Sequence, residues 1–161
     1  MLDALLRAAA YHEAGHAVAA AAMEYDVLGC SVDEHGVGST CVCWPNEEST
    51  TIAGRRRLLT VSAAGDVAEM IGVGRIDDPA VRDVDAVTCA ERMARLEASE
   101  QQREDGAWLE KRVHAEIAAA RHAARKILET QWPDVEAIAS SIGATGPNTG
   151  PSSDSASKVG G

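Results

Sequence analysis

The chain has 161 residues, which is within the usual range of a single domain that buries its own core. Its formal net charge of −10 at pH 7 argues against nucleic acid and anionic membrane surfaces as partners. The longest apolar run is far shorter than the roughly 20 residues that cross a bilayer, so we expect no membrane span. The cysteines show no C-x-x-C spacing, which favours reduced thiols and a cytoplasmic location.

Residues 2–23 form the first expected helix, because leucine, alanine and valine recur there at helical spacing. This helix contains the string H-E-A-G-H at residues 12–16. Two histidines four positions apart share one helix face, where both imidazoles can reach one zinc ion. Glu13 lies beside them and can take a proton from an activated water and pass it to a leaving amine. The pattern therefore predicts Zn²⁺ held by His12 and His16, with Glu13 as the general base.

An alternative is that both histidines are ordinary residues on the surface of the helix. The mostly apolar flanks disfavour this alternative, because two imidazoles and a carboxylate in such surroundings need polar partners.

Two short strands are expected next, at residues 27–32 and 38–44, around a turn at residues 33–36. Cys41 and Cys43 alternate along the second strand, so we expect both on one face and in the core. The second strand has two interpretations of equal weight. It could hold an extended peptide beside the metal through backbone hydrogen bonds, or it could merely cover the core.

The rest of the chain is expected to be helical up to a tail that is rich in glycine, proline and serine. The expected fold class is therefore mainly α (α+β), with a small β-hairpin near the site. We expect one domain at residues 1–143 and a disordered tail at residues 144–161. The further helices are expected at residues 52–72 and 81–99, along an apolar face from Trp108 to Leu128, and from Pro133 onward.

A third zinc ligand has to come from elsewhere, because Ala19 and Ala22 occupy the positions where an extended H-E-x-x-H-x-x-G-x-x-H motif has glycine and histidine. The remaining histidines lie in a turn or on a charged helix, so we expect their side chains at the surface. That leaves the acids between residues 66 and 85. The candidates considered are His35, Asp66, Glu69, Asp83, Asp85, His114 and His122.

Three segments resemble the peptidase domain of FtsH-type proteases, which are membrane-anchored AAA+ zinc proteases. Residues 11–17 resemble the zinc-binding segment of that family, and residues 64–71 are similar to its glycine-arginine-x-alanine-glutamate helix. Residues 82–95 resemble the helix of that family that begins with an asparagine-aspartate pair. In that family the aspartate of this pair is the third zinc ligand, and the matching residue is Asp83.

Glu69 and Asp85 stay as alternatives for the third ligand. Glu69 is the main rival, because it lies on a helix that we expect to be buried, and a buried carboxylate needs a partner. If it is not a ligand, we expect it behind the ligands, where it holds a histidine N–H.

The resemblance implies a zinc-dependent endopeptidase that acts on unfolded or flexible polypeptides. Three departures limit it: the sequence has no P-loop, Asp66 replaces the family's arginine, and Arg82 replaces its asparagine. Two other functions stay open, a non-catalytic zinc-binding adaptor for an AAA+ partner and a zinc hydrolase of non-peptide amides. A separate AAA+ unfoldase and a homo-oligomer are both compatible with the sequence.

Overall fold

The structure, a computed structural model, describes residues 2–74 and 84–144. Most of these residues are helical, and the one sheet among them is a two-stranded antiparallel hairpin, which confirms the expected class. The elements are α1 (Leu2–Ala22), β1 (Asp26–Val32), β2 (Gly38–Cys43), η1 (Asn46–Ser49), α2 (Ile52–Val73), α4 (Val84–Glu97), α5 (Glu100–Glu104), α6 (Gly106–Thr130) and α7 (Trp132–Ala144).

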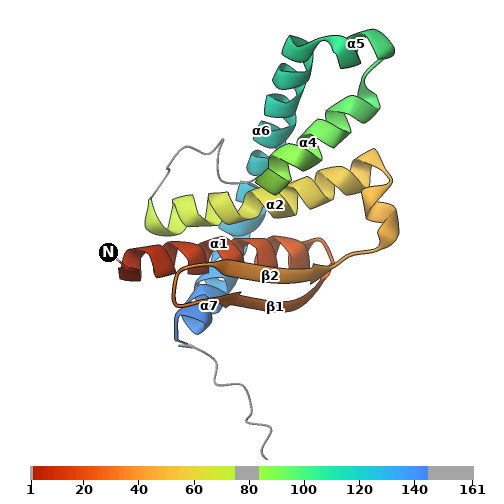
Figure 1. The fold of residues 1–161 in the computed structure, drawn as a ribbon. Coiled ribbons are helices and arrows are strands. Elements are labelled where there is room, and N and C mark those ends of the chain that lie inside the picture. The colour runs from red at the N-terminus through yellow and green to blue at the C-terminus, as the bar shows by residue number, and fades with distance from the viewer. Residues whose placement is uncertain (1, 75–83, 145–161) are drawn as a thin grey trace, which may run out of the picture.

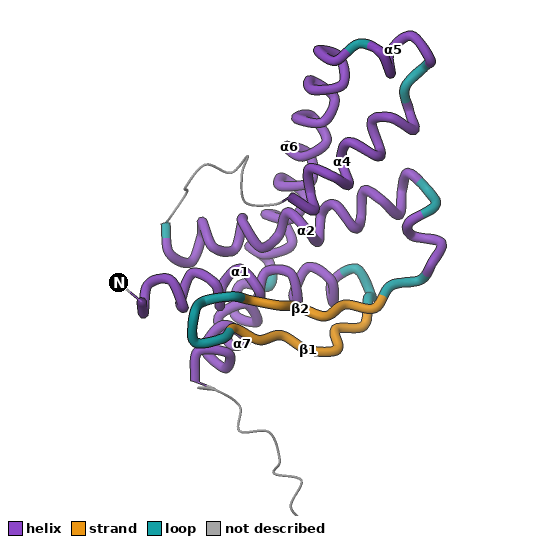
Figure 2. Tube along the Cα trace, viewed as in Figure 1, coloured by secondary structure: helices purple, strands orange, loops and turns teal. Residues whose placement is uncertain are grey.

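Helix α1 is the centre of the arrangement, with α2 along one side and the hairpin along another (Figures 1 and 2). The chain reverses direction between α1 and α2, so the two helices run antiparallel. Helix α7 packs on α1, while α4 and α6 pack on α2. Helix α4 and the start of α6 extend away from the hairpin, and the rest of α6 runs back past α2 and α1 towards α7 (Figure 1). The first helix thus contacts both the second helix and the hairpin, and a motif on it can be enclosed from two sides.

Small residues bring α1 and α2 into close contact. A Cβ on Gly15 would lie 2.5 Å from the carbonyl oxygen of Ala64 and 2.5 Å from the Cβ of Ala68, so only glycine fits at this crossing. Ala14, Ala64 and Ala68 are fully buried around it. This close approach brings the histidine motif of α1 within reach of side chains on α2.

The core has no phenylalanine, and alanine and valine supply much of its packing. Tyr11 of α1 stacks on Trp132 of α7 with ring centroids 5.7 Å apart, and Tyr25 is buried in the main core. A smaller apolar cluster, which includes Leu59 and Met93, joins α2, α4 and α6.

The hairpin turn is held by Asp33, whose carboxylate accepts hydrogen bonds from the backbone N–H of His35 at 2.9 Å and of Val37 at 2.8 Å. The pairing Cys30 with Thr40 then sets the two strands in register. As a result, the inward face of β2 carries Thr40.

The expectation that Cys41 and Cys43 lie in the core is wrong, because both are exposed. The alternation along the strand was right, but Thr40 and Val42 occupy the inward positions. Sequence alternation gives two faces and does not say which one packs on α1.

The helix bounds agree with expectation to within a few residues wherever the chain is described. The short α5 was not expected; it begins at a capping box in which Ser99 accepts from the backbone N–H of Gln102 at 3.3 Å and the Gln102 side chain accepts from the Ser99 N–H at 3.0 Å. The expected tail lies outside the described residues, except for residue 144, which ends α7. Among the described helices, none combines the length and the apolar character that crossing a membrane requires.

Candidate metal centre

His12 and His16 lie one turn apart on α1 and face α2, as the i, i+4 spacing predicts. Their ring centroids are 4.7 Å apart and the ring planes meet at 80°. The His12 side chain is 23% exposed, so the pair lies at the edge of the helix interface. The two rings are close enough to coordinate one metal ion.

Gly65 of α2 lies directly under the two imidazoles. A Cβ at this position would lie 2.5 Å from Nε2 of His16 and 2.6 Å from Nε2 of His12. The two Nε2 atoms therefore converge on one small volume, which is left open because residue 65 has no side chain. A Zn–N bond is about 2.0–2.1 Å long, so both rings could reach one ion that lies near this point and clear of the Gly65 backbone.

The other ring nitrogen of His16 is fixed by the backbone. Nδ1 of His16 lies 2.8 Å from the carbonyl oxygen of Val61. A carbonyl oxygen only accepts, so Nδ1 carries a hydrogen, and in the neutral imidazole Nε2 then keeps its lone pair. This is the tautomer that an Nε2 ligand needs.

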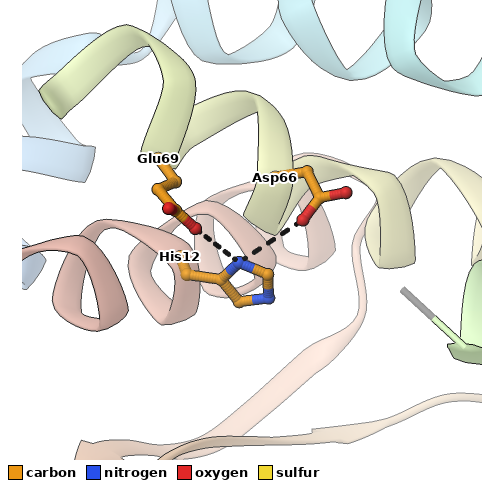
Figure 3. Close-up of side chains that lie close together, drawn as sticks. All are labelled: His12, Asp66 and Glu69. Atoms are coloured by element: carbon orange, nitrogen blue, oxygen red, sulfur yellow. Dashed lines mark ion pairs between the residues drawn. The ribbon is translucent and has the colours of Figure 1, made fainter. Parts of the chain in front are cut away.

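His12 has two carboxylates on its Nδ1 side, both from α2 (Figure 3). Nδ1 lies 3.7 Å from Oδ1 of Asp66 and 3.6 Å from Oε2 of Glu69. These distances are longer than a hydrogen bond, but the negative charges favour a hydrogen on Nδ1. Asp66 is in turn paired through Oδ2 with Arg121 of α6, at 3.2 Å.

A metal ion could in principle lie on either side of the His12 imidazole. On the Nδ1 side, ligand atoms of His12, Asp66 and Glu69 all lie within 4.8 Å of one another. However, Asp66 is already paired with Arg121, whose charge opposes a second cation. On the Nε2 side, His16 supplies a second nitrogen with the correct tautomer. The Nε2 side is therefore the better candidate for a metal, with the two carboxylates on the Nδ1 side of the ring.

Glu13 points from α1 toward the hairpin and is only 7% exposed. Its Oε2 lies 2.6 Å from the hydroxyl oxygen of Thr40 on β2. That hydroxyl also lies 3.0 Å from the backbone oxygen of Glu13, and its single hydrogen favours the shorter, charged contact. On the same strand, a side chain at Gly38 would collide with the Glu13 carboxylate. The strand thus holds a buried carboxylate in one position beside the histidine pair.

An open pocket of about 290 Å³ adjoins this carboxylate. One wall is apolar and comes from the first turns of α1, while the hairpin turn closes the opposite side. This shape leaves room for a side chain next to Glu13. The lining residues are Leu5, Ala8, Ala9, His12, Glu13, His35, Gly36, Gly38 and Glu69.

The structure brings His12, Glu13, His16 and Glu69 together, with Glu69 buried and close to the imidazole that it was expected to hold. Asp83, the third ligand that the resemblance implies, lies outside the described residues, as does the side chain of Asp85. The other histidines considered are exposed, as expected: His35, His114 and His122.

Sequence reasoning missed Thr40 and Arg121. The signal for Thr40 was the i, i+2 spacing from Gly38, which places both on one face of the strand, but the cysteines were assigned to that face instead. Arg121 carries no local signal, because its partner Asp66 is 55 positions away in the sequence.

No protein-family model and no curated protein matches this chain. The resemblance to FtsH-type peptidases therefore depends on the three short segments alone.

Proposed function

We propose that this chain is a zinc-dependent endopeptidase that hydrolyses unfolded or flexible polypeptides. One observation carries the proposal: the Nε2 atoms of His12 and His16 converge over Gly65, and the opposite nitrogen of each ring faces an acceptor. A surface pair of histidines would have no reason to be oriented in this way from both sides.

His12 and His16 would hold the ion, and Asp83 is proposed as the third protein ligand from the family resemblance. Three protein ligands leave a position open for water, whereas structural sites close with four. A zinc ion bound there supplies Lewis-acid activation of a water molecule at neutral pH. This choice of ligands gives the chain the site of a hydrolase.

Glu13 is proposed as the general base. Its carboxylate is fixed by the Thr40 hydroxyl at 2.6 Å, so it has a defined position from which to accept a proton and later donate it to the leaving amine. A structural zinc site has no use for a buried carboxylate beside its ligands. The retained Glu13 therefore favours an enzyme over an adaptor module.

An extended peptide is proposed to lie along β2. This strand pairs with β1 on one edge only, and no other strand pairs with it among the described residues. Backbone hydrogen bonds along a free strand edge bind peptides with little regard to sequence. The adjoining pocket would then receive one side chain of the substrate.

The test compares wild type with Glu13→Gln and, as a matched control, with Glu24→Gln, which changes an exposed glutamate just beyond α1. Each protein is analysed for zinc and incubated with unfolded casein. We expect Glu13→Gln to keep its zinc and lose about 10²–10⁴-fold in cleavage rate, because glutamine has the same shape and cannot accept the proton. Glu24→Gln should behave as wild type. Equal cleavage by wild type and Glu13→Gln, or none by either on varied substrates, contradicts the proposal.

A further inference from the structure

A chain of three charged or polar side chains connects α6 to the histidine pair. Arg121 of α6 donates to Oδ2 of Asp66 at 3.2 Å, and Oδ1 of Asp66 faces Nδ1 of His12 at 3.7 Å. Each member comes from a different helix, so the chain spans the three-helix packing of α1, α2 and α6. Figure 3 shows the second of these contacts, with Asp66 pointing from α2 to the imidazole.

The Asp66 carboxylate is nearly buried, with 11% of its side chain exposed. Within the described part of the chain, its Oδ1 is buried and accepts no hydrogen bond. A buried carboxylate oxygen without a donor is costly, and the N–H of His12 is a candidate donor, with Nδ1 3.7 Å away. Arg121 supplies the opposite charge that keeps this carboxylate in place.

We propose that Asp66 and Arg121 form a positioning pair for His12. Arg121 fixes one oxygen of Asp66, and the other oxygen then holds the hydrogen of His12 on Nδ1. The Nε2 lone pair consequently faces His16 over Gly65. Neither residue touches the reacting atoms; both act through the imidazole. The consequence for zinc rests on the proposed function, whereas the orientation of His12 does not.

Glu69 also faces Nδ1, at 3.6 Å, but its role is different. What distinguishes Asp66 is its ion pair with Arg121, which ties its carboxylate to α6. Helix α6 thereby influences a site to which it contributes no ligand. This predicts that a substitution on α6 changes the site only when Asp66 is present.

Two readouts test the pair. The first is the tautomer of His12 in the metal-free protein, read from long-range ¹H–¹⁵N NMR at mildly alkaline pH. The second is the affinity for zinc alone, measured by competition with a chromophoric chelator. The variants are Asp66→Asn, Arg121→Met, Arg121→Lys and the double variant Asp66→Asn with Arg121→Met. The matched control is Arg125→Met, which removes an arginine one turn further along α6 whose partner Glu129 is exposed.

We expect wild-type His12 to carry its hydrogen on Nδ1, and both Asp66→Asn and Arg121→Met to shift it toward a mixture. Loss of a group that orients a histidine ligand weakens metal binding about 10–100-fold, and we expect that loss for both. Arg121→Lys should recover most of it. The double variant should bind zinc no more weakly than Asp66→Asn, because Arg121 acts through Asp66. Arg125→Met should stay within about twofold of wild type, since exposed pairs contribute little.

An unchanged His12 tautomer in Asp66→Asn overturns the pair, and so does a further loss of zinc affinity when Arg121→Met is added to it. An equal loss in Arg125→Met would assign the effect to the overall charge of α6. If wild type binds no zinc at all, the proposed function fails. The His12 tautomer in the metal-free protein still tests whether Asp66 and Arg121 position His12. Circular dichroism melts of each variant identify any that does not fold, and Arg121→Lys then decides the test.

Discussion

Replacing Gly65 by alanine tests the metal centre with a single methyl group. The added carbon would lie 2.5 Å from Nε2 of His16 and 2.6 Å from Nε2 of His12, on the side of both rings where an ion would bind. The methyl group and the zinc ion exclude each other, so the imidazoles can accommodate the methyl only by turning away. Apparent zinc binding energies of about 10–16 kcal/mol over four ligands correspond to about 2.5–4 kcal/mol per ligand. Losing even one histidine should therefore weaken zinc binding about 10²–10³-fold.

The effect on folding should be much smaller. Alanine in a helix interior is about 1 kcal/mol more favourable than glycine, while inserting a methyl group into a packed site costs about 1–3 kcal/mol. The net change in the free energy of unfolding of the metal-free protein is then about 0–2 kcal/mol. The partly exposed His12 side chain makes the low end attainable, because it can swing outward.

Gly15→Ala provides the comparison, because it adds the same atom at the same helix interface. Its Cβ meets the Ala64 carbonyl and the Ala68 Cβ at 2.5 Å, and backbone cannot swing away. We expect this variant to lose stability in a thermal melt without a specific loss of zinc affinity in its folded fraction. Gly65→Ala should show the reverse in chelator competition. Wild-type zinc affinity in folded Gly65→Ala would refute the reasoning and place any metal elsewhere.

Four further outcomes follow from other parts of the molecule. Thr40→Val removes the hydrogen bond to Glu13, the proposed general base, so it should cost about 1–3 kcal/mol of stability and lower casein cleavage, with zinc content unchanged. Burial raises the pKa of Tyr25 to about 12 from 10.0, so the folded state holds this proton more tightly than the unfolded chain. The free energy of unfolding should fall as the pH rises from about 10 to about 12, and Tyr25→Phe should remove that slope in urea unfolding. Cys41 and Cys43 should react quickly with Ellman's reagent, whereas Cys30 should react slowly because burial raises the pKa of its thiol. ATP should not change the rate of casein cleavage by the purified chain, because the sequence has no P-loop.

Local sequence signals predicted the helices and strands well and the contacts between them less well. The helical period and the H-E-x-x-H spacing placed His12 and His16 on one face of α1, because both are properties of a single helix. The Gly74 that ends α2 has a φ of 68°, and glycine in that position was a readable signal.

Contacts between elements were harder to predict. The inward position of Thr40 depends on which face of the hairpin packs on α1, and period-two alternation does not decide that. The pairing of Asp66 with Arg121 depends on the packing of α2 against α6. Neither contact follows from periodicity, since each is set by the tertiary arrangement.

Because the strands of the hairpin pair in a fixed register, the number of residues in its turn decides whether Thr40 faces α1. Surface turns usually tolerate insertions. Here, Val32 pairs with Gly38 and Cys30 with Thr40 across a turn that Asp33 closes. If one residue were added to the turn and the strand pairing shifted by one position, every side chain of β2 would move to the opposite face. The Thr40 hydroxyl would then point away from α1. Two added residues would restore it, so natural variation or engineering of this turn should follow an even-number rule.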